Sequence, residues 1–245
     1  MDHQKKFYAS ISRYYSAIFP FNPAQLIFIQ KQLHELKDKV ILDVGCATGE
    51  LAFALAETGA DITGIDLNDH LLEVAQEGIP QPNLRFMALD MLHLSDNFQS
   101  DHFDTVLCFG NTLVHLKELK EMKQFFFEVS KVLKEGGHFL LQILHYDHIL
   151  DEQISELPLI ENDILRFERH YQFEEGSRMV QFKTELHLKS ENQLISNQTQ
   201  LFALKRRELE HLLKQEGYKD IKMYSNFNGD PIGGRHLPLV ISCRK

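Results

Sequence analysis

Through residue 144, short apolar runs alternate with segments in which apolar residues recur at helical spacing. The run at 40–44 is rich in β-branched residues and ends in a glycine-containing turn, so it predicts a strand leading into a helix. The pattern as a whole predicts strands at 40–44, 61–66, 84–88, 103–109 and 139–144, with helices at 51–57, 69–76 and 117–133. Strands joined by helices make right-handed crossovers, which favour a parallel sheet covered on both faces.

After about residue 150 the hydrophobic pattern changes. Polar and apolar residues alternate, as they do in antiparallel strands, at 165–173, 179–188 and 198–204. We therefore expect residues 150–204 to form an antiparallel β insertion after the fifth strand. The insertion should lie over the carboxyl ends of the parallel strands as part of a lid.

Helical periodicity returns at 206–215, stops at Gly217, and is followed by strand-like runs at 221–225 and 239–243. These segments raise the expected number of strands in the main sheet to seven. We expect residues 1–245 to form a single α/β domain, mostly parallel and with helices on both faces.

An amphipathic helix is expected at 22–36, inside an N-terminal helical cap over 1–37. The segment before this helix is rich in aromatic residues, among them the adjacent pair Tyr14 and Tyr15.

Composition narrows the class of partner. Lys plus Arg number 26 against 35 Asp plus Glu, a net charge of −9, and no basic cluster interrupts that balance, so nucleic acid is not an expected partner. The apolar runs are too short for a signal peptide or a membrane span. Cys46, Cys108 and Cys243 are widely separated and show no CxxC spacing, so no metal site is expected. A cytoplasmic protein, monomeric or homodimeric, fits these features.

The turn after the first expected strand, Asp43-Val44-Gly45-Cys46-Ala47-Thr48-Gly49-Glu50, is a candidate binding loop. It lies at the carboxyl end of a strand, where open α/β sheets bind ligands. Glycines allow the backbone to approach a ligand closely, and the free N–H groups of the following helix can hold a carboxylate.

Two further acids end the next expected strands, Asp66 in Gly64-Ile65-Asp66-Leu67 and Asp90 in Leu89-Asp90-Met91. A single aspartate after a strand more often caps a helix. Together with Asp43, however, these acids follow three successive strands, which indicates one shared constellation at the carboxyl edge of the sheet.

Three segments match a known family. VILDVGCATGE resembles motif I of the class I S-adenosylmethionine-dependent methyltransferases, GIDLN resembles their ribose-binding strand end, and LKEGGHFLL resembles the lead-in to their fifth strand. The resemblance covers the chain up to Leu144 and the final helix and two strands, and it implies a Rossmann-like fold with S-adenosylmethionine as cofactor. Ala47 stands where a middle glycine is frequent.

The resemblance assigns the glycine loop to the methionine part of the cofactor, Asp66 to the ribose hydroxyls and Asp90 to the adenine amino group. Tyr14 is similar to aromatic residues that fold over the cofactor, although it could equally hold the first helix on the sheet. The residues expected at the cofactor are Tyr14, Asp43, Gly45, Cys46, Ala47, Gly49, Asp66, Leu67, Asp90, Met91 and Phe109.

A narrower similarity follows the fourth strand. CFGNTLVHL looks like the GNSxxHL segment of glycine N-methyltransferases, and YDHIL looks like their NYDxIL segment. The likeness implies that Gly110 and Asn111 line the cleft beside the transferred methyl group and that Tyr146 walls the acceptor pocket. Asn111 could instead cap a turn, and His115 could simply pack on the helix at 117–133.

The candidates for catalysis are Asn111, His115, His145 and Tyr146, acting on nitrogen or oxygen of a small-molecule acceptor. Glycine is not expected to be that acceptor, because glycine-methylating relatives carry an arginine where this chain has Leu144. Arg166, Arg169 or Arg235 could supply a cation from elsewhere.

Three other functions compete with catalysis of methyl transfer. A nicotinamide-dependent dehydrogenase would need GxGxxG, whereas residues 45–49 read GxxxG. An interaction module would need a long apolar or charged stripe, which the sequence lacks. A non-catalytic S-adenosylmethionine-binding regulator is compatible with the sequence and is kept as the alternative.

Overall fold

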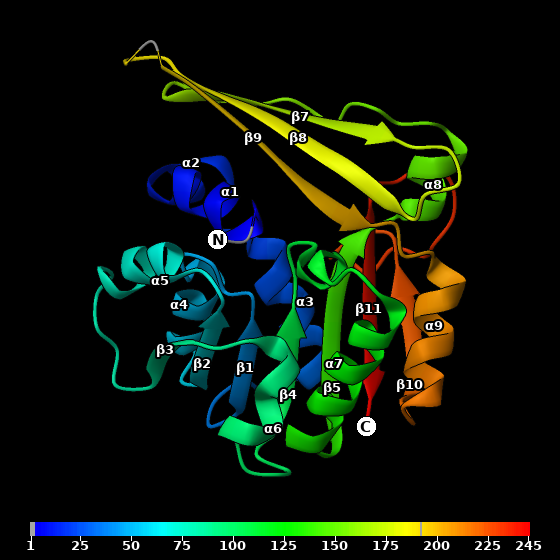
Figure 1. The fold of residues 1–245 in the computed structure, drawn as a ribbon. Helices are drawn as coiled ribbons and strands as arrows, with labels where there is room; N and C mark the ends of the chain where they lie inside the picture. Colours follow the sequence, from blue (N-terminus) through cyan, green and yellow to red (C-terminus); the bar gives the residue numbers. More distant parts are fainter. Residues whose placement is uncertain (1–2, 192) are drawn as a thin grey trace.

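The computed structural model describes residues 3–191 and 193–245, and its main element is a seven-stranded sheet in the order β10-β11-β5-β4-β1-β2-β3 (Figure 1). Its strands are β1 (Val40–Val44), β2 (Asp61–Asp66), β3 (Leu84–Ala88), β4 (Phe103–Cys108), β5 (Leu133–Leu144), β10 (Lys219–Tyr224) and β11 (Pro238–Arg244). β1 to β5 pair in parallel, while β11 runs antiparallel to both β5 and β10. The predicted Rossmann-like, mostly parallel sheet is confirmed.

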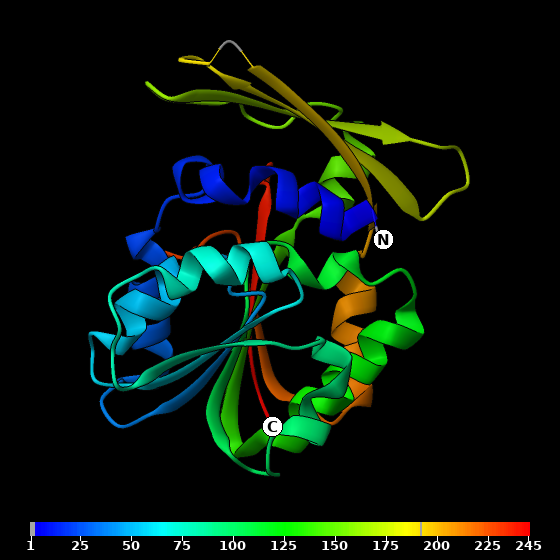
Figure 2. The same ribbon diagram turned by 60° about the vertical axis from the view of Figure 1, so that its left-hand side comes forward.

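Helices cover both faces of this sheet (Figure 2). The longer ones are α1 (His3–Ile11), α3 (Pro23–Leu33), α4 (Glu50–Ala56), α5 (Asp69–Gln76), α7 (Leu119–Val132) and α9 (Arg206–Gln215). Shorter helices and 3₁₀ turns are η1 (Ser12–Tyr14), α2 (Tyr15–Ile18), η2 (Met91–His93), α6 (Leu94–Asn97), η3 (Thr112–His115) and α8 (Tyr146–Asp151).

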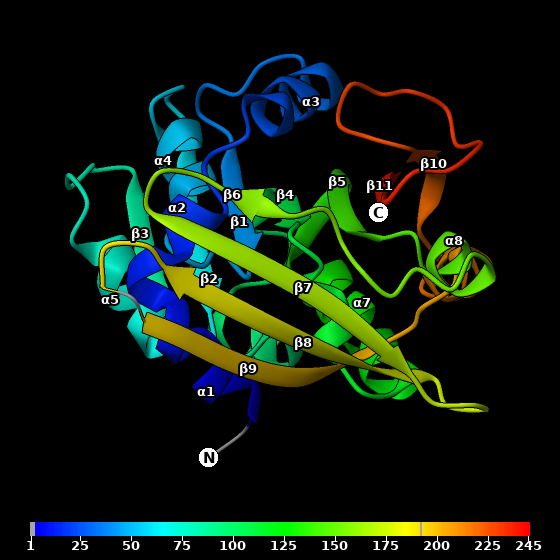
Figure 3. The ribbon, with the colours of Figure 1, turned by 90° about the horizontal axis from the view of Figure 1, so that it is seen from above.

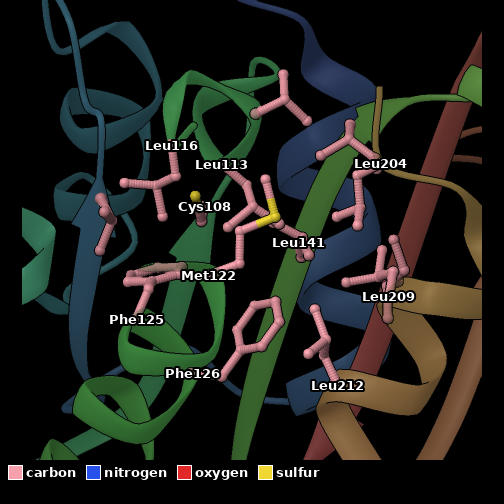
Figure 4. Close-up of a cluster of buried hydrophobic side chains, with 14 of the residues drawn as sticks. Cys108, Leu113, Leu116, Met122, Phe125, Phe126, Leu141, Leu204, Leu209 and Leu212 are labelled. Carbon is pink, nitrogen blue, oxygen red and sulfur yellow. The ribbon is translucent and has the colours of Figure 1, made fainter. Parts of the chain in front are cut away.

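Neighbouring residues of one strand serve opposite faces of the sheet, as the pleat requires. Ile41 of β1 belongs to the core cluster under α3 and α4, whereas the next residue, Leu42, belongs to the cluster under α7 and α9. Figure 4 shows the second cluster, in which Met122, Phe125 and Phe126 of α7 gather with side chains of β4, β5 and α9. Burial of both faces explains why β1, which reads VILDV, is apolar at four of its five positions.

A second sheet, antiparallel, has the order β6-β7-β8-β9. Its strands are β6 (Ile160–Glu161), β7 (Leu165–Phe173), β8 (Met179–Leu188) and β9 (Gln193–Phe202). Seen from above in Figure 3, β7 to β9 cross over the main sheet, and we call this second sheet the roof. The expected antiparallel insertion is present.

The N-terminal helices lie between the roof and the main sheet (Figures 1 and 2). Phe7 and Ile11 of α1 and Ile18 of α2 are buried against Phe167 of β7 and Leu186 of β8. The roof is therefore held down by apolar contacts with residues of the expected N-terminal cap, of which Met1 and Asp2 lie outside the described residues.

Some boundaries differ from the sequence expectations. β9 was expected to begin at 198 but begins at Gln193, because Gln193 to Asn197 pair with Leu188 to Thr184 across the hairpin although only some of these side chains are apolar. β5 begins at Leu133 rather than 139, since Leu133 pairs with Phe103. In both cases pairing with a neighbouring strand extended the element beyond its apolar run. None of the described helices has the length and apolarity needed to span a bilayer.

Candidate functional site

Two cavities lie at the carboxyl ends of β1, β2 and β4. The first, of about 270 Å³, is lined by residues that follow β2 and β3, and we call it the β2 cavity. The second, of about 440 Å³, reaches from the β1 loop to the roof, and we call it the roof cavity. The two are neighbours, because six residues line both: Tyr8, Tyr15, Gly45, Ala47, Gly110 and His115.

The loop after β1 has a backbone that few residues other than glycine adopt. Gly45 and Gly49 have φ values of 75° and 85°, and Ala47 has a φ of 49°. A Cβ on Gly45 would lie 2.5 Å from the Thr112 hydroxyl oxygen, so the loop also packs closely on η3. The amides of Gly45 and Cys46 both donate to the carbonyl of Ile65, at 2.8 and 3.0 Å, which attaches the loop to β2.

Asp66 connects the end of β2 to the same loop. Its carboxylate accepts hydrogen bonds from the backbone amide of Ala47 at 3.0 Å and from that of Asn68 at 2.9 Å. Burial raises the pKa of Asp66, and the hydrogen bonds from these amides oppose that rise. Asp66 and the neighbouring Leu67 line the β2 cavity, where the carboxylate has lone pairs left for a ligand.

Asp43, at the end of β1, is a buried acid with 4% of its surface exposed, and it lines the roof cavity. Burial raises its pKa to about 7, with a further contribution from the negative charge of Asp66. In the part of the chain that the structure describes, Asp43 forms no ion pair with a lysine or arginine. A buried carboxylate in this setting favours a ligand that carries a positive charge.

Asp90 caps a 3₁₀ turn and also lies in the lining of the β2 cavity. One carboxylate oxygen accepts from the amide of Leu92 at 2.9 Å, so Asp90 caps η2. It also lines the β2 cavity, together with the apolar Leu89, Met91 and Leu92. These apolar side chains suit the faces of a flat ring, and the free carboxylate oxygen suits an amino group on its edge.

Asn111 joins the ends of β4 and β5. It has a left-handed backbone (φ 69°), its side-chain oxygen accepts from the amide of Leu144 at 2.9 Å, and its side-chain nitrogen donates to the hydroxyl of Tyr146 at 3.1 Å. It makes no side-chain cap bond to η3, so the turn-capping alternative is wrong. Asn111 lines the roof cavity, whereas the fully buried Tyr146 is outside both linings.

His115 and Tyr8 meet where the cavities join. The Tyr8 hydroxyl and Nε2 of His115 are 2.9 Å apart, although 107 residues separate them in the sequence. Burial raises the pKa of Tyr8, so its hydroxyl stays protonated near neutral pH. The sequence expectations passed over Tyr8, but Tyr8 and Tyr15 are seven residues apart, a spacing typical of one helix face.

Besides Tyr146, three of the expected site residues lie outside both linings. Tyr14 faces solvent and donates to the carboxylate of Glu191 at 3.3 Å. Gly49 is the residue just before α4, and a Cβ there would lie 2.6 Å from the ring of Phe86. His145 stacks on His236 with ring centres 4.6 Å apart. Of the other expected residues, Cys46 and Phe109 line the roof cavity.

A group of possible metal ligands lies away from the cavities. Three side chains on β7 and β8 each place one potential ligand atom within 4.8 Å of the others: Glu168, Glu185 and His187. Arg166 already pairs with the Glu168 carboxylate. The guanidinium therefore supplies positive charge to this group without a metal ion.

Comparison with known proteins gives a consistent result. Residues 41–137 match the family model described as a methyltransferase domain. A Geobacillus sp. (strain WCH70) protein that carries a methyltransferase name is 36% identical over 163 residues, which are 64% of each chain. A glycine/sarcosine N-methyltransferase of Aphanothece halophytica is 28% identical over 204 residues, covering 82% of this chain and 74% of the relative. The chain thus spans about two thirds to three quarters of the length of these two relatives.

The fold has close structural neighbours. An S-adenosylmethionine-dependent methyltransferase from Clostridium acetobutylicum superposes with a TM-score of 0.80 at 19% identity, covering 97% of this chain and 98% of that one. At this level of identity the match concerns the fold, and it includes the roof as well as the main sheet because almost the whole of both chains is covered.

Proposed function

We propose that this chain, a member of the class I S-adenosylmethionine-dependent methyltransferases, transfers the methyl group of that cofactor to nitrogen or oxygen of a small-molecule acceptor bound in the roof cavity. The observation that carries the proposal is the joining of two cavities around Gly45, Ala47, Tyr8 and His115. One cavity has the lining for an adenosyl group and the other has room for a second molecule.

The residues present fit S-adenosylmethionine. Asp43 is a buried carboxylate without a cationic partner among the described residues, which suits the ammonium and sulfonium charges. The loop amides from Gly45 to Ala47 already donate within the protein, so the methionine carboxylate would be held by amides at the start of α4. In the β2 cavity, Asp66 would accept from the ribose hydroxyls and Asp90 from the adenine amino group, with Leu67 and Met91 against the adenine ring.

When bound, S-adenosylmethionine supplies a methyl group that is already electrophilic because it is attached to a sulfonium sulfur. The protein's task is then to align the acceptor and to exclude water, and alignment lowers a barrier by about 7–11 kcal/mol in favourable intramolecular cases. The roof and α1 lie above the carboxyl ends of the main-sheet strands (Figure 1). Side chains of both line the roof cavity, which restricts the access of water.

Apart from Asp43, whose pKa is about 7 and whose carboxylate is assigned to the cofactor, the site offers few groups that can take a proton near neutral pH. Burial raises the pKa of Tyr8 and Tyr15, and it raises that of Tyr146 to about 12, so these hydroxyls act as hydrogen-bond partners rather than bases. We propose that His115, whose Nε2 is hydrogen-bonded with the Tyr8 hydroxyl, takes the proton of the acceptor. We propose that Asn111 orients the acceptor. His145 and Tyr146 have supporting positions outside the cavities.

The alternative, a non-catalytic regulator, needs no space for a second molecule. The roof cavity favours the enzyme, because polar groups of Asn111, Gln142 and Arg169 converge on it. The test is calorimetry with S-adenosylhomocysteine, followed by mass spectrometry of small amines, phenols and carboxylic acids incubated with the protein and S-adenosylmethionine. Binding with a methylated product supports the proposal, and failure to bind the cofactor would refute it.

A further inference from the structure

Arg169 interrupts an otherwise apolar or aromatic row of side chains in β7. In β7, alternate residues point toward the same face of the sheet. Leu165, Phe167 and Tyr171 share one face, are all buried, and contribute to the cores beneath the roof. Arg169 stands in the same alternating row, whereas Arg166 belongs to the opposite row, which is more exposed.

Among the described residues that line the roof cavity, Arg169 is the only lysine or arginine. It has no carboxylate partner among the described ion pairs. Its Nη2 donates to the carbonyl of Pro158 at 2.7 Å, which anchors the guanidinium to the segment before β6. Its Nε is buried without a hydrogen-bond partner. Burial lowers the pKa of Arg169, although an arginine remains charged at neutral pH.

Other polar atoms lie in the same row of the roof. Thr184 of β8 pairs directly with Arg169, and its hydroxyl oxygen is also buried without a partner. A half-buried guanidinium that lines a cavity and has no carboxylate partner can bind an anion through charge-assisted hydrogen bonds. The acids that share the cavity, Asp43 and Glu50, form no ion pair with Arg169, and Glu50 is engaged by Thr48.

The remaining lining around Arg169 is mostly apolar. Leu157, Phe182 and Leu201 come from the roof and the segment before it, and Phe19 comes from the end of α2. An acceptor as small as glycine would leave these apolar side chains without contacts to a ligand. Leu144, also in the lining, offers no charge to a carboxylate, so the guanidinium available to a carboxylate in this cavity is that of Arg169, in the roof.

We propose that Arg169 binds a carboxylate of the methyl acceptor, and that the acceptor is a carboxylic acid with an apolar aryl or alkyl body. The carboxylate pairs with the guanidinium under the roof, the apolar body contacts Phe19 and Phe182, and the nucleophilic group lies toward Asn111 and His115. This assignment rests on the proposed methyl-transfer function, and it names the substrate class of the same site.

The test uses the full chain saturated with S-adenosylhomocysteine. Calorimetry would measure binding of aryl and alkyl carboxylates from benzoate to octanoate, each compared with its primary amide, with glycine as the small carboxylate. The wild type is expected to bind the preferred carboxylates at least about tenfold more tightly than their amides. Arg169→Leu should remove this difference, and Arg169→Lys should retain part of it.

Arg166→Leu is the matched control, because Arg166 is on the same strand but in the opposite row, and it should behave as the wild type. The proposal is overturned if amides bind as well as carboxylates throughout the series, or if Arg169→Leu and Arg169→Lys both keep the full preference. Binding of S-adenosylhomocysteine is measured first in every variant. If the wild type did not bind S-adenosylhomocysteine, the proposed function would be contradicted. If it bound S-adenosylhomocysteine but showed no preference for carboxylates, only the Arg169 assignment would be contradicted.

Discussion

The carboxylate of Asp66, at the end of β2, accepts a hydrogen bond from the backbone amide of Ala47, in the loop after β1, at 3.0 Å. This bond joins the two elements from which the cofactor site is built. Asp66 thus has a structural role in shaping the loop in addition to the proposed contact with the ribose, and a substitution at this position tests both roles.

Asp66→Asn should weaken the binding of S-adenosylhomocysteine by about 10- to 100-fold, because hydrogen bonds from the ribose hydroxyls to a charged acceptor would be lost. Isothermal titration calorimetry measures the change. Asp61→Asn is the control, since Asp61 is exposed at the opposite end of the same strand. Equal affinity of Asp66→Asn and the wild type would refute the assignment.

Cofactor binding should become tighter as the pH rises through about 7, the value to which burial raises the pKa of Asp43. Below that pH the carboxylate is mostly protonated and offers no charge to the cofactor's ammonium group, whereas above it the carboxylate is ionised. Titrations with S-adenosylhomocysteine between pH 5.5 and 8.5, on the order of 1.5 pH units to either side of this pKa, measure the slope. Asp43→Asn should bind weakly and without this dependence, and an equally steep slope in that variant would contradict the prediction.

The stability of the ligand-free chain should respond to Asp43 in the opposite direction. Because the folded-state pKa of Asp43, about 7, lies above the ordinary aspartate pKa of 3.8, its contribution to stability is fully present below the lower value. It is lost as the pH rises through the higher value. Asp43→Asn should therefore raise the free energy of unfolding at pH 8, by roughly a few kcal/mol, and change it little at pH 4. Urea titrations at both pH values would show this, and a variant less stable than the wild type at pH 8 would argue against it.

Asn111→Ala should lower the free energy of unfolding by about 2–4 kcal/mol. The substitution leaves the amide of Leu144 without its partner, removes a donor to Tyr146, and places alanine at a φ of 69°. Urea denaturation measures the loss, with the exposed Asn228 replaced by alanine as the control. A change below about 0.5 kcal/mol, the usual range for surface positions, would show that these bonds contribute little.

Tyr8→Phe should reduce methyl transfer by about tenfold, because His115 loses the hydroxyl that holds its Nε2. Once an acceptor has been identified, steady-state kinetics with mass-spectrometric detection give kcat and KM. Tyr14→Phe, outside both cavities, should have the activity of the wild type. If the two variants behaved alike, Tyr8 would have no part in the reaction.

Much of the fold follows from the sequence alone. The β-branched runs and the helical spacing predicted the first five strands and the helices α4, α5 and α7, although not the short α6 between β3 and β4. Alternation predicted β7 and β8 with their observed bounds. The sequence also predicted three aspartates at the carboxyl edge of the sheet, Asp43, Asp66 and Asp90. Each directly follows, or ends, an apolar run, and that position can be read from the neighbouring residues alone.

The tertiary structure alone decided which side chains meet above that edge. Tyr8 rather than Tyr14 lines the cavities, because the packing of α1 under the roof sets which helix face turns inward. Arg169 was one of three arginines left open by the sequence, and it lines the roof cavity because the register of β7 puts it in the inward row. Periodicity along the chain determined the elements, whereas contacts between residues far apart in sequence, such as Tyr8 with His115, depend on how those elements pack.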